Sequence, residues 1–549
     1  MFSTLRTERC GTLFPVFTMV AVLSGFALRP PHEVVAATIR VPGGHRTIQS
    51  AIDAAHPGDT VLVLPGVYKE RLRLKPRITL RSKGDDTKGK LGLKRAEATI
   101  IDGAGKGDRP GVAMAEGATL DGFTVTNIGR YDDARWKKHH ATHGERQSHA
   151  HIGRPGTPGI GVAGVNCTVV NNIVHHNGST GIAVRGVKER RCSPRLFRNV
   201  SYRNMGGGIG SMQGSTAIIE QNICFQNFYA GIGQNHADPI IIGNRCYQNI
   251  RAGIGISEGS KPIVRRNKCY RNRRAGIGIR TGAETAPVVE DNDCYGNDMA
   301  GIGSRDDARP IIRNNRCYRN MLAGIGTRNR AQAVIVGNDC RDNKRSGIGV
   351  RDGAKAKILG NKCIDNKLVA IGIRGKADAY IARNELQRTG GMPPMIAVRD
   401  GSTAVVTGNI IRGGGVAGLL VQGTARITGN DFVGNGPRRG PGPPNFAVWV
   451  RSGSDVLVSG NHISGWRHAL DASGARKIRV IENTASGFLG TAFVVTGTST
   501  PAHLFGNVAL SGNPKDKVIA VTGPRGVIAE NQRKQPSKSR SGQSIRSKP

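Results

Sequence analysis

Apolar and polar positions along this chain recur in a unit of about 23 residues. Three residues before a recurring asparagine the position is aliphatic, as at Val264 and Ile312, and ten residues after it an isoleucine recurs, as at Ile277 and Ile325. The clearest copies of the asparagine follow one another at steps of 22 to 25 residues: Asn222, Asn244, Asn267, Asn292, Asn315, Asn338 and Asn361. A fixed period of this size predicts a solenoid.

Each unit predicts three short β segments, because its apolar runs are too brief for helices and are separated by turns rich in Asn, Gly and Asp. Strands that stack on their equivalents form parallel sheets, and such connections are right-handed by default. We therefore expect an all-β chain: a right-handed, single-stranded parallel β-helix over residues 38–531, with about 18 coils spaced by about 4.8 Å. Thr47 is expected to cap a short helix that closes the N-terminal end, with Ile48 and Ile52 on one face.

Two columns of the repeat are predicted to be structural. The asparagines are expected to occupy left-handed turn positions and to bond side chain to backbone. Later units place Leu386 and Ile411 where earlier ones have cysteine, so the cysteine column is expected to hold small buried thiols, with a line of ligands for a soft metal such as copper(I) as the alternative. The column contains Cys224, Cys246, Cys269, Cys294, Cys317, Cys340 and Cys363. Whether Cys167 and Cys192 pair stays open.

Composition narrows the choice of partner. The 549 residues include 77 glycines and only 5% aromatic residues, and the formal net charge is +40. Such a charge predicts attraction to polyanions such as acidic polysaccharide, anionic lipid or nucleic acid. Nucleic acid is the weakest of these expectations, because aromatic residues on which bases stack are scarce and export is expected.

The two ends of the chain differ from the repeat. Arg6 and Arg9 precede an apolar run over residues 13–28 and small residues at 35–37, so residues 1–37 have the layout of a secretory signal peptide. That run is shorter than the roughly 20 residues of a membrane span, and no later segment is apolar enough, so we expect a secreted or periplasmic protein without a transmembrane segment. Residues 532–549 are rich in Lys and Arg among Ser, Gln, Gly and Pro, which predicts a basic disordered tail.

The opening of the repeat region resembles a known superfamily. The motifs that carry the resemblance are Ile48-Gln49-Ser50-Ala51-Ile52, Pro57-Gly58-Asp59-Thr60-Val61 and Pro65-Gly66-Val67-Tyr68-Lys69-Glu70. They are similar to the start of secreted proteins of the pectin-lyase-like superfamily. The units behind them resemble the repeats of carbohydrate-binding and sugar-hydrolysis domains, mannuronan epimerases and NosD-like periplasmic proteins. The resemblance implies a β-helix over residues 38–531; an enzyme of this kind would be a lyase, epimerase or hydrolase acting on polyuronates. Most catalytic motifs of these families are missing from this sequence. A calcium-dependent lyase would need clustered carboxylates beside a basic residue, and Asp306-Asp307 next to Arg305 is the grouping of that kind.

Strand alternation predicts one face of the β-helix that combines glycine and arginine. In the segment at residues 276–280 the isoleucines are expected to point inward, so that both glycines and Arg280 point outward. Equivalent outward positions include Gly278, Gly303, Gly326 and Gly349, with Gly276, Gly301, Gly324 and Gly347 beside them, and the arginine row is Arg280, Arg305, Arg328, Arg351, Arg374 and Arg399. Three interpretations stay open: a groove that binds a polyanion, a solubilising edge in which Arg305, Arg351 and Arg399 pair with the acids that follow them, and a docking face for another protein.

One insertion interrupts the repeat, over residues 129–158. It contains His139, His140, His143, His149 and His151. Five histidines within 13 residues predict either a site for a divalent metal (Ca, Cu or Zn), with zinc or copper bound through imidazole, or a general base. A loop with a purely structural or nonspecific basic role is the alternative.

Three functions follow from these patterns. The leading hypothesis is an exported β-helix that binds, or also modifies, an acidic polysaccharide along the glycine and arginine face. The second is a NosD-like, metal-associated periplasmic accessory protein that uses the histidines of the insertion. The third is a structural or adhesive rod without catalytic activity.

Overall fold

The computed structural model describes residues 36–87, 89–147, 156–187, 191–399, 401–413, 415–437 and 445–536. The predicted signal peptide, except for its last two residues, lies outside these ranges, as do His149, His151 and residues 537–549. Residues from Ala37 onward belong to one compact unit.

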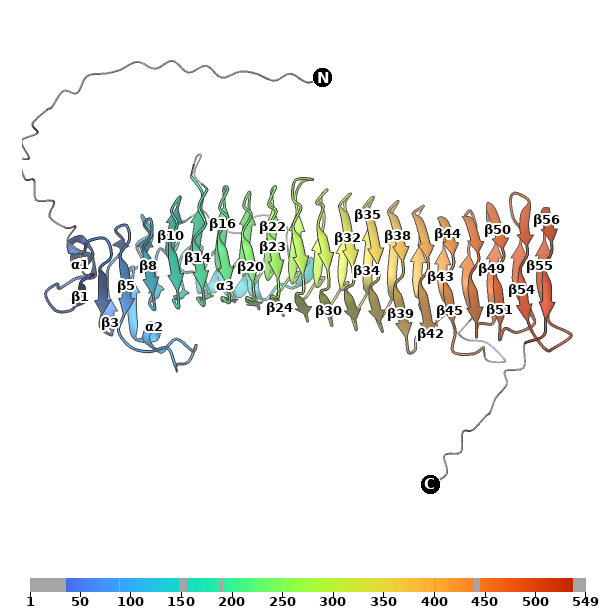
Figure 1. Cartoon of the computed structure of the whole chain (residues 1–549), viewed down its shortest axis with the longest axis horizontal. Coiled ribbons are helices and arrows are strands. Elements are labelled where there is room, and N and C mark those ends of the chain that lie inside the picture. The colour runs from blue at the N-terminus through green and yellow to red at the C-terminus, as the bar shows by residue number, and fades with distance from the viewer. Residues whose placement is uncertain are drawn as a thin grey trace, which may run out of the picture. The chain divides into compact units, whose positions relative to one another are not determined.

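That unit is a parallel β-helix whose coils stack along one axis (Figure 1). From β2 (Thr60–Val63) onward, each complete coil contributes one strand to each of three parallel sheets, A, B and C in chain order. Sheet A runs from β1 (Thr38–Val41) to β56 (Arg525–Ala529), sheet B from β3 (Gly66–Tyr68) to β57 (Gln532–Lys534), and sheet C from β4 (Leu72–Arg73) to β55 (Lys517–Thr522). Sheet A holds 20 strands, more than the roughly 18 coils expected. The first coils have Leu64, Lys83 and Phe123 in place of the recurring asparagine. The strand β57 also extends the β-helix three residues into the predicted tail.

The helices lie at the start of the β-helix and in the insertion. The predicted capping helix is confirmed as α1 (Ile48–Ala54), in which Ile48, Ala51 and Ile52 are buried and the Thr47 side chain accepts a hydrogen bond from the Ser50 amide. A helix α2 (Lys94–Ala98), the insertion helix α3 (Asp133–His140) and the 3-10 turn η1 (Gly144–Arg146) were not expected. Within the described residues, no helix has the length and apolar content to cross a membrane.

The core consists of the columns that the sequence pattern predicts. Val264, Ile312 and Ile277 are fully buried, and so is every cysteine of the column from Cys224 to Cys363. All described cysteines are free thiols, Cys167 and Cys192 included. Burial raises the pKa of Cys246 and Cys294 well above the usual range of a thiol, so these side chains stay protonated and pack as small apolar groups.

The repeat asparagines form a continuous hydrogen-bonded ladder inside the turn. The Asn315 side-chain oxygen accepts hydrogen bonds from the Asn292 backbone N–H and from Asn292 Nδ2, both at 2.9 Å. Asn315 Nδ2 donates to Val289 O and to Asn338 Oδ1. Such buried polar groups are stable only because each finds a partner. The bonding to backbone is confirmed, but the left-handed position is not the asparagine: it is the residue before it, such as Asn314 with φ 55°. A second ladder stands five residues later: Asn227, Asn249, Asn272, Asn297, Asn320, Asn343 and Asn366.

Candidate functional site

A long groove of about 800 Å³ runs over the outer face of sheet C. Its floor is formed by β16 (Ile209–Met212), β19 (Ile232–Asn235), β22 (Ile254–Ser257), β25 (Ile277–Arg280), β28 (Ile302–Ser304), β31 (Ile325–Thr327), β34 (Ser346–Arg351) and β37 (Val369–Arg374). One glycine from each strand lies on the floor in direct register: Gly210, Gly233, Gly255, Gly278, Gly303, Gly326, Gly349 and Gly372. At about 4.8 Å per coil the floor is roughly 35 Å long.

The two glycines of each Gly-Ile-Gly segment have different surroundings. A Cβ on Gly303 would meet only the Ala300 Cβ, at 3.9 Å, so this glycine points outward as predicted. A Cβ on Gly301 would lie 2.7 Å from Gly324 O and 2.8 Å from Asn320 Nδ2. The prediction that Gly276, Gly301, Gly324 and Gly347 also face outward is therefore wrong. These glycines stand at the corner before the strand, where the next coil approaches too closely for a side chain.

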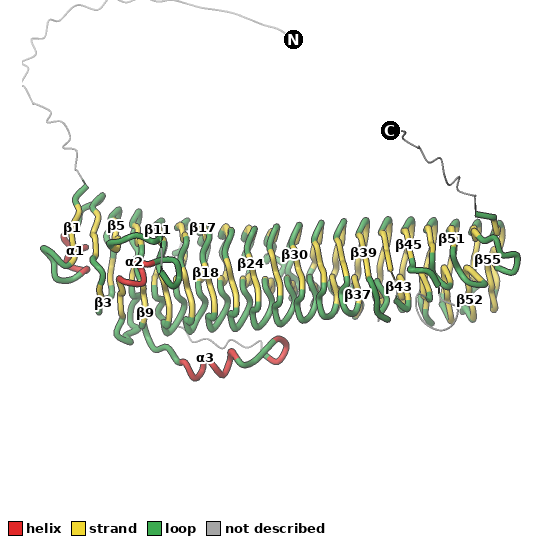
Figure 2. The backbone as a smooth tube through the Cα atoms, turned by 90° about the horizontal axis from the view of Figure 1, so that it is seen from below, coloured by secondary structure: helices red, strands yellow, loops and turns green. Residues whose placement is uncertain are grey.

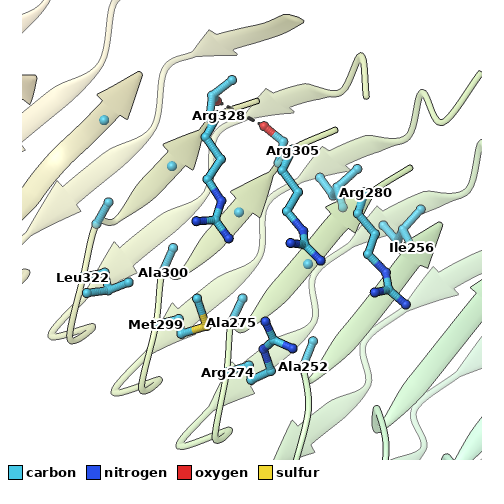
Figure 3. A pocket seen from close by; sticks show the side chains of 18 of the residues that line it. Ala252, Ile256, Arg274, Ala275, Arg280, Met299, Ala300, Arg305, Leu322 and Arg328 are labelled. Atoms are coloured by element: carbon cyan, nitrogen blue, oxygen red, sulfur yellow. Dashed lines mark hydrogen bonds between the residues drawn. The ribbon is translucent and has the colours of Figure 1, made fainter. Parts of the chain in front are cut away.

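The six predicted arginines form the first wall of the groove. Arg280, Arg305, Arg328 and Arg351 are half-buried, and Arg374 and Arg399 are exposed; all six line the groove. Figure 3 shows Arg280, Arg305 and Arg328 side by side, with their guanidinium groups extended in one direction over the floor. The interpretation that turn acids pair with some of them also has support, because Asp306 lies 3.3 Å from Arg305 and Asp352 lies 3.5 Å from Arg351. Asp400 lies outside the described residues.

The second wall was missed by the sequence analysis. It stands at the corner between sheets B and C, and each member comes two residues after an asparagine of the second ladder. The wall consists of Tyr229, Arg251, Arg274, Met299, Leu322, Arg345 and Leu368. Three arginines of this second wall therefore face the arginine row of the first wall, as Figure 3 shows for Arg274. The apolar members of the second wall and a row of alanines complete the lining of the groove.

The two walls concentrate positive charge in a partly dehydrated space. Burial, together with Arg251, Arg305, Arg280 and Arg328, lowers the pKa of Arg274 to about 9. Burial is also the first cause that lowers the pKa of Arg305 and Arg351, with neighbouring arginines contributing. A guanidinium that is desolvated and surrounded by other cations is stabilised when an anion binds.

The insertion helix α3 lies alongside the coils of the β-helix (Figure 2). Asp132 caps α3 by accepting a hydrogen bond from the Arg135 amide. The Trp136 side chain is buried in an apolar cluster with Met205, Phe228 and Ile250, and its indole Nε1 donates to Gln226 O at 2.7 Å. The insertion is thus attached to successive coils rather than projecting from them.

The described histidines of the insertion contact different aromatic or acidic side chains, and the Arg273 guanidinium lies near both His140 and His143. The His139 ring meets the edge of Phe228 at 5.1 Å, and His140 stacks on Trp136 at 4.4 Å. Burial, followed by the charge of Arg273, lowers the pKa of His140 to about 4. His143 Nδ1 lies 2.7 Å from Asp298 Oδ2. Over the residues that the structure describes, no three His, Cys, Asp or Glu side chains are placed to share a metal ion. With His149 and His151 outside those residues, the five-histidine metal site stays a prediction.

Comparison with known families agrees with the coil architecture. A family model described as "Right handed beta helix region" matches residues 158–298, 278–386 and 390–533. The chain belongs to this right-handed β-helix family. No curated protein sequence matches the chain.

Several solved structures are similar to this chain. The periplasmic alginate epimerase AlgG has 14% identity and a TM-score of 0.33, with 66% of this chain and 81% of AlgG covered. The A-module of the Azotobacter vinelandii mannuronan C-5 epimerase AlgE4 has 16% identity and a TM-score of 0.35, with 66% and 90% covered. The pre-mature gene product 12 of bacteriophage phi29 has 12% identity and a TM-score of 0.46, with 88% and 71% covered.

The groove of this right-handed β-helix ends where the floor column changes residue type. After Gly372 the register continues through Ala397 and Leu420 to Trp449, and then to Asp471 and Val494. Side chains therefore occupy the space that stays open over the glycines. The predicted glycine and arginine positions are brought together in one groove, and the insertion borders the same groove through Glu145.

Proposed function

We propose that this chain is an exported protein that binds a linear acidic polysaccharide along the groove on sheet C. The observation that carries the proposal is the pair of arginine-bearing walls that face each other across a floor without side chains. Over the coils from Arg280 to Arg399, a polymer lying on this floor would meet a new guanidinium about every 4.8 Å. Paired hydrogen bonds from guanidinium to carboxylate or sulfate would relieve the repulsion between the arginines.

The lining favours a polysaccharide over a single-stranded nucleic acid. Proteins that bind single strands stack successive bases on aromatic side chains. Within the described part of the chain, Tyr229 is the one aromatic residue that lines the groove. The glycine and alanine floor, with Met299 and Leu322 on one wall, instead suits the apolar faces of sugar rings.

The experiment measures binding to polygalacturonate, alginate and dextran sulfate at two salt concentrations. Replacing Arg280, Arg305, Arg328 and Arg351 together by Gln should weaken binding on the order of 100-fold, since four charged contacts are lost. The matched control removes four exposed cations from the outer face of sheet A and should leave binding nearly unchanged: Lys357, Arg426, Lys477 and Arg479. Equal weakening in both variants would show that net charge alone drives binding and would refute a groove.

A further inference from the structure

One carboxylate of the insertion lies among the arginines of the groove. Glu145, in η1, lines the groove, and its carboxylate lies 3.9 Å from Arg345 on the second wall. Both side chains are about half exposed, at 51% and 53%. The charge of Glu145 also acts on Arg351 of the first wall, where it opposes the lowering of that arginine's pKa. Glu145 therefore presents to both walls the same group that an acidic polysaccharide would present.

The residues just before Glu145 hold it in this place. His143 Nδ1 lies 2.7 Å from Asp298 Oδ2, and the Gly144 amide donates to Arg273 O at 2.8 Å. Gly144 has φ +56°, and a Cβ there would lie 2.8 Å from Asp298 O. A side chain at residue 144 would be strained both by the backbone conformation and by this contact. The glycine therefore allows the insertion to approach the coil closely enough for Glu145 to reach the groove.

From this placement we propose that Glu145 is an internal competitor for the polyanion, an inference that rests on the proposed function. Its carboxylate pairs with the Arg345 guanidinium until a carboxylate or sulfate of the polymer replaces it. An exposed ion pair is weak, so a polymer that engages several arginines at once displaces Glu145 at little cost. A short or sparsely charged ligand forms fewer ion pairs with the groove arginines, so it binds less well against the competing carboxylate of Glu145. Glu145 thus tunes the groove toward long ligands with closely spaced charges.

The test compares Glu145→Gln with the wild-type protein in binding to polygalacturonate at low salt. The variant should bind about three- to tenfold more tightly, because one competing charge near the polymer is removed. The gain should be larger for short oligogalacturonates than for the polymer. The matched control is Glu284→Gln, which removes an exposed glutamate 3.3 Å from Lys261 and changes the net charge equally; its affinity should stay unchanged.

Two further variants link the effect to geometry. Gly144→Ala should displace η1 and tighten binding in the same direction as Glu145→Gln. In an Arg345→Gln background the gain from Glu145→Gln should shrink, since the partner of Glu145 is gone.

The outcomes separate the two proposals. If wild type binds through the groove arginines but Glu145→Gln binds equally or more weakly, the competitor is refuted and the polysaccharide groove stands. If the four-arginine variant binds as tightly as wild type, the groove itself is refuted. A gain from Glu284→Gln equal to that from Glu145→Gln would reduce the effect to net charge and would also refute the competitor.

Discussion

The coils from Met205 to Arg399 and the coils from Thr403 onward have the same backbone arrangement, but the outer face of sheet C carries different residues in the two regions. Both regions have the buried asparagine ladder, which continues without a break from Asn222 through Asn430 to Asn507. In the first region the outward column of sheet C is glycine from Gly210 to Gly372, whereas in the second it contains Leu420, Trp449 and Val494. The groove is therefore a property of one column of residues and not of the fold.

This difference separates stability from function within the repeat. Asparagine and the aliphatic columns recur in both regions, because each coil needs the same hydrogen bonds and the same core. The floor glycines add no packing, and a side chain at Gly303 or Gly326 would meet nothing closer than 3.9 Å. At six of the eight coils, from Gly210 to Gly326, a Cβ would meet no atom closer than 3.4 Å, so sterics do not require glycine there and an open surface is the shared consequence.

Filling the floor should have the largest effect on binding. Replacing Gly303 and Gly326 by Trp gives the first region the surface that Trp449 gives the second, and polyanion affinity should fall on the order of 100-fold or more as the contacts are blocked. Stability should change little, because the β-helix already accommodates a tryptophan at the equivalent place. Binding assays and thermal melts check both parts. Val494→Trp is the control, and a loss of binding there would contradict the account.

The asparagine ladder should contribute equally in the two regions. Asn315→Ala and Asn461→Ala each remove a side chain that accepts two hydrogen bonds and donates three. Each substitution should lower the free energy of unfolding by about 2–4 kcal/mol, because buried backbone groups lose their partners. Urea unfolding followed by circular dichroism measures the change. A large difference between the two variants would mean that the regions do not share one stabilising plan.

The two glycines of one segment should respond differently to the same substitution. Gly301→Ala should cost about 1–3 kcal/mol of folding stability, since its Cβ would overlap the next coil. Gly303→Ala should stay within about 0.5 kcal/mol of wild type. Denaturant midpoints of the two variants test this pair, and equal costs would show that the corner glycine is not closely packed.

Acid should weaken the coils at the start of the β-helix. Burial, followed by the neighbouring His176, lowers the pKa of His175 to about 4, so this side chain is neutral in the folded protein. The unfolded chain binds a proton below about pH 6.5, so stability is complete above that pH and is lost as the pH falls toward 4.

Melting temperatures at pH 7.5 and 5 measure this loss, which should be on the order of 2 °C. His175→Phe keeps the stacking on Tyr202, whose ring lies 4.9 Å away, and should remove part of the pH dependence. An unchanged profile in the variant would assign the acid sensitivity to other groups.

Most of the fold could be predicted because it repeats. The aliphatic columns, the cysteine column, the capping helix and the outward positions of Gly278 and Arg280 all follow from periodicity and strand alternation. The left-handed turn residue was misplaced by one position, because asparagine is the usual occupant of such turns whereas here its side chain is needed inside the ladder.

Less of the site could be predicted. The residue type at the second-wall position varies among Tyr, Arg, Met and Leu, so no single residue recurs there. Its constant spacing, two residues after each asparagine of the second ladder, could have identified the position. The insertion gave no local clue to its docking, since His143 and Asp298 are 155 residues apart. Gly301 and Gly303 look alike in the repeat, and only the approach of the next coil distinguishes them.

The most direct test of the groove is the dependence of affinity on ligand length. Size-defined oligogalacturonates should bind more tightly with each added sugar until the ligand spans the roughly 35 Å of glycine floor, and affinity should then level off. The same series on the variant with Gln at positions 280, 305, 328 and 351 should be weak and nearly flat. An affinity that is independent of length in the wild-type protein, or a rise that continues far beyond the floor, would contradict a groove that binds one polymer chain along successive coils.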